Sequence, residues 1–194
     1  MTITPDCNTI LKLAEKYSIV PVCREIYADV TTPITLLRKL TGFSKRYYLL
    51  ESIEGGETWG RYSFLGYDPV MRVTCRDRKV YIEKQGKTET VETEKPLHVL
   101  REIMKDYKSP RLSGMPPFTG GFVGYFAYSM VGYAEPVLNI KKGTFPDYDV
   151  MLFDKVIAYD HLKQKICIIV NMRTDKVMEN YGEATAEIAR IAGL

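Results

Sequence analysis

Apolar residues recur at helical spacing in four segments, and this spacing predicts helices over residues 4–17, 33–40, 96–107 and 174–192. Thr4 and Thr32 each precede a proline, and Thr174 opens the last segment. A threonine hydroxyl can cap the N-terminus of a helix, and proline suits the first helical turn. We therefore predict that these three threonines are N-cap residues.

Short apolar runs between turn residues predict strands over residues 19–28, 47–53, 59–67, 71–76, 79–84, 88–93, 149–159 and 165–172. Asp77-Arg78 joins two of these runs and residues 160–164 join the last two, as in antiparallel hairpins. With 194 residues, the chain is long enough for one sizeable core. The pattern predicts an α+β fold with largely antiparallel sheets and helices packed on the outside, forming a single domain over residues 1–194.

Charge and cysteine usage exclude several classes of protein. The net charge of +3 is small, and basic residues are spread along the chain without the stripe that nucleic-acid binding requires. The four cysteines form no Cys-x-x-Cys pair, which disfavours a zinc site and a disulfide framework and predicts free, mostly buried thiols in a reducing compartment. No apolar stretch is long enough to span a membrane. We expect a cytoplasmic protein.

Polar residues interrupt the two apolar runs between residues 47 and 66. These are Glu51 and Ser52 on the first run and Arg61 and Ser63 on the second. A strand that places a charge or a hydroxyl among apolar residues must satisfy it by hydrogen bonding or use it for binding. Glu51 and Arg61 could pair as a salt bridge, or the segment could bind an amino acid through its ammonium and carboxylate groups. Spacing does not decide between these two interpretations.

A second unusual segment runs from residue 118 to 128 and contains Gly120, Gly121 and Gly124. Glycine within a strand indicates close approach of the backbone by a ligand or by another strand. We favour a bulged strand whose glycines admit neighbouring aromatic residues, because no partner motif accompanies them and no helix follows at the spacing of a dinucleotide-binding motif. The chain contains no established catalytic motif, and His161 in a hairpin turn is interpreted as structural.

Four blocks of this sequence, taken in order, resemble anthranilate synthase component I. The first block is Pro21-Val-Cys-Arg-Glu-Ile26. The second combines Leu49-Leu-Glu-Ser52 with Gly60-Arg-Tyr-Ser-Phe-Leu-Gly66. The third is Gly120-Gly-Phe-Val-Gly-Tyr125 with Tyr128 and Glu135, and the fourth is Asp154 followed by residues 156–161, which end in Asp160-His161. The blocks extend over most of residues 20–172.

The resemblance implies that the chain is the N-terminal domain of a longer enzyme of tryptophan biosynthesis. In this family, the N-terminal domain implies allosteric feedback inhibition by L-tryptophan. The Leu-Leu-Glu-Ser motif contributes to the inhibitor pocket, which places Leu50, Glu51 and Ser52 there. The adjacent strand adds Arg61, Tyr62 and Ser63 as further candidates. The resemblance implies no catalytic residue, metal ligand or cofactor in this chain.

The same resemblance implies partners outside the chain. The family enzyme is a lyase that converts chorismate and ammonia to anthranilate and pyruvate in a Mg²⁺-dependent C-terminal domain. A glutamine amidotransferase subunit, component II, supplies the ammonia. Without its catalytic domain the chain would expose apolar surface or sheet edges, and we expect it to self-associate.

Three other interpretations remain open at the level of sequence. Aminodeoxychorismate synthase component I, a folate-pathway enzyme, shares parts of the four blocks, although Glu51-Ser52 and the Arg61–Gly66 run favour the anthranilate member. The chain could also be a stand-alone amino-acid-binding module. Finally, it could be a purely structural α+β domain in which Glu51 and Arg61 form a buried ion pair.

Overall fold

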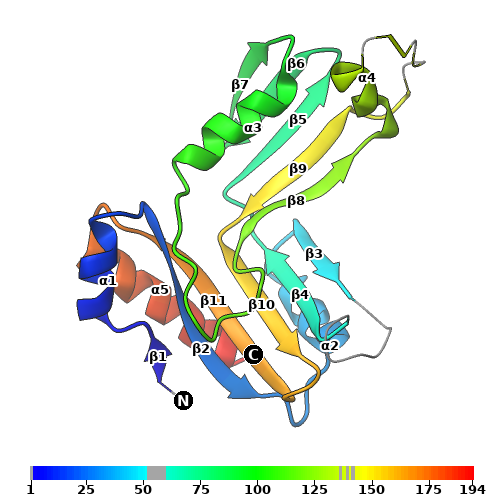
Figure 1. Ribbon diagram of the computed structural model, residues 1–194. Coiled ribbons are helices and arrows are strands. Elements are labelled where there is room, and N and C mark those ends of the chain that lie inside the picture. The colour runs from blue at the N-terminus through cyan, green and yellow to red at the C-terminus, as the bar shows by residue number, and fades with distance from the viewer. Residues whose placement is uncertain (1, 52–59, 136, 139, 141–142) are drawn as a thin grey trace. The chain divides into compact units, whose positions relative to one another are not determined.

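The computed structural model describes residues 2–51, 60–135, 137–138, 140 and 143–194, and its strands form two antiparallel sheets (Figure 1). Two compact units divide the chain. The first consists of residues 1–69, 107–120 and 154–194, and the second of residues 70–106 and 121–153. The predicted α+β class is confirmed, with helices beside sheets whose described strand pairs are all antiparallel.

The first unit contains a six-stranded sheet in the order β1-β2-β11-β10-β4-β3. The strands are β1 (Ile3–Thr4), β2 (Ile19–Tyr27), β3 (Tyr47–Leu50), β4 (Tyr62–Tyr67), β10 (Lys155–Asp160) and β11 (Lys165–Arg173). Apolar residues occupy most of the central positions of β10 and β11, and both strands lie in the interior of the sheet. Both strands are buried on both faces, and apolar residues therefore occupy consecutive positions along them instead of alternating with polar residues.

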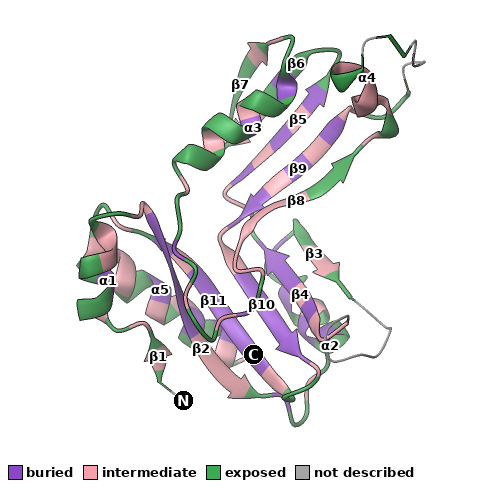
Figure 2. Cartoon of the chain, viewed as in Figure 1, coloured by how far each residue is buried: buried purple, intermediate pink, exposed green. Residues whose placement is uncertain are grey.

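Three helices pack on one face of this sheet: α1 (Cys7–Ala14), α2 (Pro33–Leu40) and α5 (Val177–Ala192). Their buried residues Ile10, Leu40 and Ile188 belong to one apolar cluster with strand residues that include Leu65 and Ile168. The other face carries a smaller cluster around Val156, Ala158 and Ile169, against which Met115 and Phe118 of the segment after residue 107 pack. Figure 2 shows the resulting buried positions along the central strands.

The second unit contains a five-stranded sheet in the order β7-β6-β5-β9-β8. Its strands are β5 (Met71–Arg76), β6 (Lys79–Lys84), β7 (Lys87–Glu92), β8 (Gly121–Phe126) and β9 (Tyr148–Phe153). Helix α3 (Pro96–Lys105) packs against β6, and the buried Tyr148 hydroxyl donates to the carbonyl of Pro96 at 3.2 Å. A 3₁₀ turn (Tyr128–Met130) and the short helix α4 (Val131–Ala134) follow β8.

The predicted strand over residues 149–159 is wrong, because this segment divides between the two sheets. It forms β9 in one sheet and β10 in the other, with Asp154 between them. The carbonyl of Asp154 accepts from the backbone N–H of Asn171 at 2.8 Å and from its side-chain amide at 2.9 Å. Burial raises the pKa of the Asp154 carboxyl, while the neighbouring Lys155 ammonium at 3.1 Å opposes this rise. A polar residue inside an apolar run thus marks the point where the chain changes sheets.

Two of the three predicted helix caps are wrong. Thr32 caps α2, since its hydroxyl accepts from the N–H of Thr35, as predicted. Thr4 instead lies in β1, and Asp6 caps α1 by accepting from the N–H of Thr9. Thr174 donates its hydroxyl to the carbonyl of Tyr17 at 2.7 Å, and α5 begins at Val177. The hydroxyl of Thr174 is thus used in a contact between distant segments.

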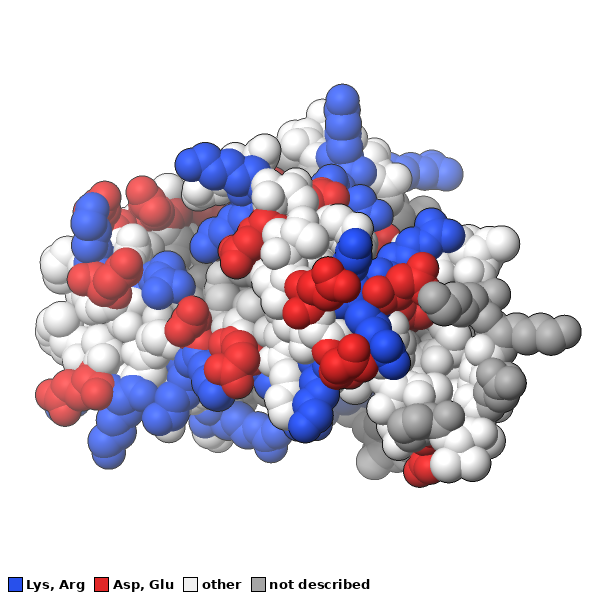
Figure 3. Space-filling model, turned by 90° about the horizontal axis from the view of Figure 1, so that it is seen from above, with Lys and Arg blue, Asp and Glu red and all other residues white. Residues whose placement is uncertain are grey.

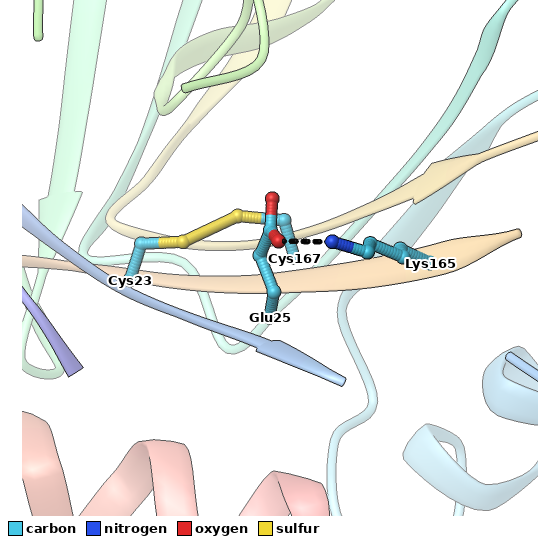
Figure 4. The surroundings of a disulfide bond; sticks show 4 residues. All are labelled: Cys23, Glu25, Lys165 and Cys167. Carbon is cyan, nitrogen blue, oxygen red and sulfur yellow. Dashed lines mark hydrogen bonds and ion pairs between the residues drawn. A yellow bond between two sulfur atoms is a disulfide. The ribbon is translucent and has the colours of Figure 1, made fainter. Parts of the chain in front are cut away.

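The prediction that all four cysteines are free thiols is also wrong. Cys23 and Cys167 form a disulfide between the neighbouring strands β2 and β11, beside the ion pair of Glu25 and Lys165 (Figure 4). Cys167 lies opposite Glu25 in this register, so the two cysteines are diagonal neighbours on one face of the sheet. They are 144 residues apart in sequence, and local spacing therefore gives no sign of the pair. Cys7 and Cys75 are free.

On the face shown in Figure 3, lysine and arginine side chains are interspersed with aspartate and glutamate. Within the described part of the chain, no helix combines the length and the apolar character that a membrane span requires.

Candidate functional site

The predicted site residues lie at the ends of two paired strands of the first unit. Leu50 is the last residue of β3 and is 50% exposed, and Glu51 follows it on the surface. Arg61 immediately precedes β4, which Tyr62 and Ser63 begin. Ser52 lies outside the described residues. The two predicted strands are therefore shorter in the described structure, at Tyr47–Leu50 and Tyr62–Tyr67.

The register of β3 and β4 assigns these residues to different faces of the sheet. Leu50 lies opposite Phe64. Side chains alternate along a strand, so Leu50, Tyr62 and Phe64 share one face, where the two aromatic residues pack against the smaller apolar cluster. Ser63 points to the other face and is completely buried. Leu50 and Tyr62 thus lie on the same face of the sheet, whereas the hydroxyl of Ser63 is directed to the other face.

The described partner of Arg61 is Asp160, at the end of β10. The guanidinium donates from Nε at 3.1 Å and 3.2 Å and from Nη2 at 2.6 Å to the two carboxylate oxygens. Asp160 also accepts from the backbone N–H groups of Leu162 and Lys163, each at 3.0 Å. The ion pair that one interpretation gave to Glu51 is therefore made by Asp160, which leaves Glu51 on the surface. Asp160 also fixes the turn between β10 and β11.

Ser63 is held by His161, the first residue after β10. The hydroxyl oxygen of Ser63 and Nε2 of His161 are 2.7 Å apart. The backbone N–H of His161 donates to the carbonyl of Arg61 at 2.9 Å, and its ring lies 4.7 Å from that of Tyr159. His161 is half-buried. It is bonded to β4 through its side chain and to the residue before β4 through its backbone. This agrees with a structural histidine and adds a defined partner.

Tyr62, the residue between Arg61 and Ser63, contacts both a cation and an aromatic ring. The guanidinium carbon of Arg61 is 4.8 Å from the Tyr62 ring centroid, and the ring stacks on Phe64 at 5.7 Å. Phe64 in turn meets Phe118 edge to face at 5.6 Å. Burial raises the pKa of the Tyr62 phenol, and the charge of Asp160 raises it further. The site therefore offers an apolar and aromatic surface beside a guanidinium.

Sequence reasoning missed Asp160 and His161 as members of this group. Both residues belong to the fourth block of the resemblance, which ends in Asp160-His161. Asp160 pairs with Tyr62 across the sheet, so the block and the start of β4 are neighbours in space. In the sequence, only the joint occurrence of the second and fourth blocks links Asp160 and His161 to the start of β4.

Two sizeable cavities lie elsewhere. One of about 680 Å³ in the first unit has Phe43, Tyr67, Lys155 and Arg190 in its lining, and one of about 620 Å³ in the second unit has Arg78, Tyr133 and Asp147. None of the described site residues lines either cavity. Within the described ranges, no group of three or more histidine, cysteine or acidic side chains is placed to hold a metal ion.

The ion pair of Asp160 predicts how stability depends on pH. Burial alone would raise the pKa of the Asp160 carboxyl, but the hydrogen bonds from Arg61 and from two backbone N–H groups lower it below its ordinary value. A lowered folded-state pKa stabilises the protein above about pH 4 and loses this contribution as the pH falls further. We expect Asp160→Asn to lower the melting temperature at pH 6 and the difference from wild type to shrink towards pH 2.

Melting curves between pH 2 and pH 7 test this expectation. Asp29→Asn, at an exposed carboxylate, is the matched control and should change the curves little. A difference between Asp160→Asn and wild type that stays constant over the whole range would contradict the expectation.

Comparison with known proteins finds relatives of one name along most of this chain. No protein-family model matches the chain. Anthranilate synthase component 1 of Acetivibrio thermocellus is 39% identical over 178 residues, which cover 90% of this chain and 36% of that protein. The protein of the same name from Aquifex aeolicus is 33% identical over 192 residues, which cover 98% of this chain and 39% of that protein. Over 90% or more of its own length, this chain is therefore similar to part of anthranilate synthase component I.

The fold agrees with this similarity. The crystal structure of anthranilate synthase component I from Streptococcus pneumoniae TIGR4 matches 88% of this chain with a TM-score of 0.56 and 26% identity, and the match covers 36% of that structure. This chain spans a little over a third of the length of the anthranilate synthase relatives that it matches.

Proposed function

We propose that the chain is the regulatory part of an anthranilate synthase component I and carries part of its feedback site for L-tryptophan. The observation that carries this proposal is the joint placement of Leu50 and Tyr62 on one face of β3 and β4, with Arg61 over the Tyr62 ring. An aromatic amino acid needs an apolar surface for its ring and a cation or N–H donors for its carboxylate. Arg61 uses Nε and Nη2 for Asp160, and Nη1 is outside this pair.

Two further residues of the proposed site, Glu51 and Ser52, would add polar contacts to the ligand. Glu51 is exposed directly after Leu50, and its carboxylate would meet the ammonium group of tryptophan. Ser52 is the next residue, and its hydroxyl would serve the ligand's carboxylate. Further contacts would come from the part of the enzyme outside this chain. The site within this chain is therefore partial.

In the whole enzyme, the proposed reaction is the conversion of chorismate and ammonia to anthranilate and pyruvate, in tryptophan biosynthesis. We place this lyase chemistry and its Mg²⁺ requirement in the part outside the chain. We also propose component II, a glutamine amidotransferase, as the partner that supplies ammonia. The chain alone would be inactive. The shared name of the matched relatives favours this enzyme over aminodeoxychorismate synthase component I.

Calorimetric titration with L-tryptophan, on the chain and on the longer enzyme that carries it, tests the proposal. We expect saturable heat with the longer enzyme, weaker heat with the chain, and none with D-tryptophan in either case. The fluorescence of anthranilate tests the second part: the chain mixed with chorismate, an ammonium salt and Mg²⁺ should form none. Absence of heat from both proteins would contradict the feedback site, and anthranilate formation by the chain would contradict its inactivity.

A further inference from the structure

The hydroxyl of Ser63 is placed to hold the site and not to touch a ligand. It is completely buried and lies on the face of the sheet opposite to Leu50 and Tyr62. Its hydrogen bond to Nε2 of His161 is 2.7 Å long. A ligand on the Leu50 and Tyr62 face would therefore meet the backbone of β4 between itself and this hydroxyl.

His161 and its neighbour Asp160 bind the residues before and after Tyr62, which are Arg61 and Ser63. The N–H of His161 donates to the carbonyl of Arg61, the residue before Tyr62, and its ring binds Ser63, the residue after it. Asp160 holds the Arg61 guanidinium from the same turn. The turn is itself fixed, since the side-chain amide of Gln164 donates to the carbonyl of His161 at 2.7 Å. The backbone at Tyr62 thus takes its position from this turn.

We infer that His161 is a positioning residue of the proposed tryptophan site, which it holds in place through the Ser63 hydroxyl. The inference rests on the proposed function. A serine hydroxyl both donates and accepts, so the bond to Nε2 forms with either tautomer of the imidazole. Without this bond the first residues of β4 would keep their backbone pairing, and Arg61 would keep its ion pair with Asp160. The backbone at Tyr62 would lose its connection through Ser63 to the turn after β10. The Tyr62 ring would then be less fixed in its orientation towards a ligand, and binding would pay for ordering it.

Four variants test this inference, each measured in the longer enzyme by tryptophan titration and by amide hydrogen exchange. His161→Ala and Ser63→Ala should each weaken tryptophan binding about tenfold and raise exchange at residues 61–64. The double variant should be little worse than either single one, because both remove the same bond. His161→Gln, whose amide can still reach the hydroxyl, should recover most of the affinity. The control is His98→Ala at the other histidine of the chain, which is exposed on α3 and should change neither measurement.

The outcomes separate the inference from the proposed function. Wild-type affinity in His161→Ala and Ser63→Ala, with faster exchange at residues 61–64, would overturn the positioning role and leave the tryptophan site intact. Equal losses in His161→Gln and His161→Ala would also overturn it, since a bond that the amide can restore would then not be the cause. Failure of the wild-type enzyme to bind tryptophan would overturn the proposed function, and the inference with it.

Discussion

Gly124→Ala is expected to destabilise the second unit by about 3 kcal/mol or more, the upper end of the range for overpacked sites. An added Cβ would lie 2.1 Å from the carbonyl oxygen of Asp149 and 2.6 Å from Cα of Val150. Both atoms belong to the backbone of β9, so no side-chain rotation relieves the overlap. β8 would have to move away from β9 and lose its pairing. Urea unfolding followed by circular dichroism measures the loss, and hydrogen exchange at β9 locates it.

Gly182→Ala is the matched control for this substitution. Gly182 lies inside α5, and an added Cβ would meet no atom within 4 Å. Alanine favours a helix over glycine by about 1 kcal/mol, so this variant should be slightly more stable than wild type. Wild-type stability of Gly124→Ala would contradict the close approach of β8 to β9.

The sequence predicts that the glycines of this segment allow close approach of the backbone. At Gly124 the neighbour that approaches is the backbone of another strand, β9.

Features that depend on neighbouring residues could be predicted from the sequence. Thr32-Pro33 begins α2 as expected, because a cap and the first helical turn involve only adjacent residues. The hairpin of β5 and β6 around Asp77-Arg78 has the predicted bounds for the same reason. The α+β class follows from the sum of such local patterns.

Features that depend on distant partners could not be predicted. Asp154 ends β9 because Asn171, from β11, binds its carbonyl. The hydroxyl of Thr174 donates to the carbonyl of Tyr17, which is 157 residues earlier in the chain, and so it does not cap α5. Cys23 and Cys167 meet only because β2 and β11 pair in one particular register. In each case the decisive contact is set by sheet pairing, which periodicity along the chain does not encode.

The candidate site divides in the same way. Arg61 and Ser63 stand out in the sequence as polar residues in an apolar run, and both have polar partners in the structure. Those partners, Asp160 and His161, are 99 and 98 residues away. Alternation along the strand could place Ser63 and Tyr62 on opposite faces of the sheet. It could not show that the Ser63 hydroxyl is hydrogen-bonded to His161. The sequence therefore indicates which residues need polar partners, but it does not predict which residues those partners are.

Ser52→Phe in the longer enzyme is expected to weaken inhibition by tryptophan at least about tenfold while leaving the uninhibited rate close to wild type. Ser52 follows Leu50 and Glu51 in the motif that the resemblance assigns to the inhibitor pocket. A phenylalanine ring in place of a hydroxyl removes a hydrogen-bonding group and fills space that the ligand would occupy. The measurement is the tryptophan concentration that halves the rate of anthranilate formation.

The two halves of this expectation test different claims. Weaker inhibition in the variant requires that tryptophan bind at the Ser52 segment. An unchanged uninhibited rate requires that the reaction take place at a different site. Allosteric coupling needs two such distinct sites. Ser113→Phe, which adds the same ring at an exposed position of the first unit, should preserve both inhibition and rate. Unchanged inhibition in Ser52→Phe would remove this motif from the tryptophan site. Loss of the uninhibited rate in Ser52→Phe, with Ser113→Phe unaffected, would instead connect this segment to the catalytic step and contradict a purely regulatory chain.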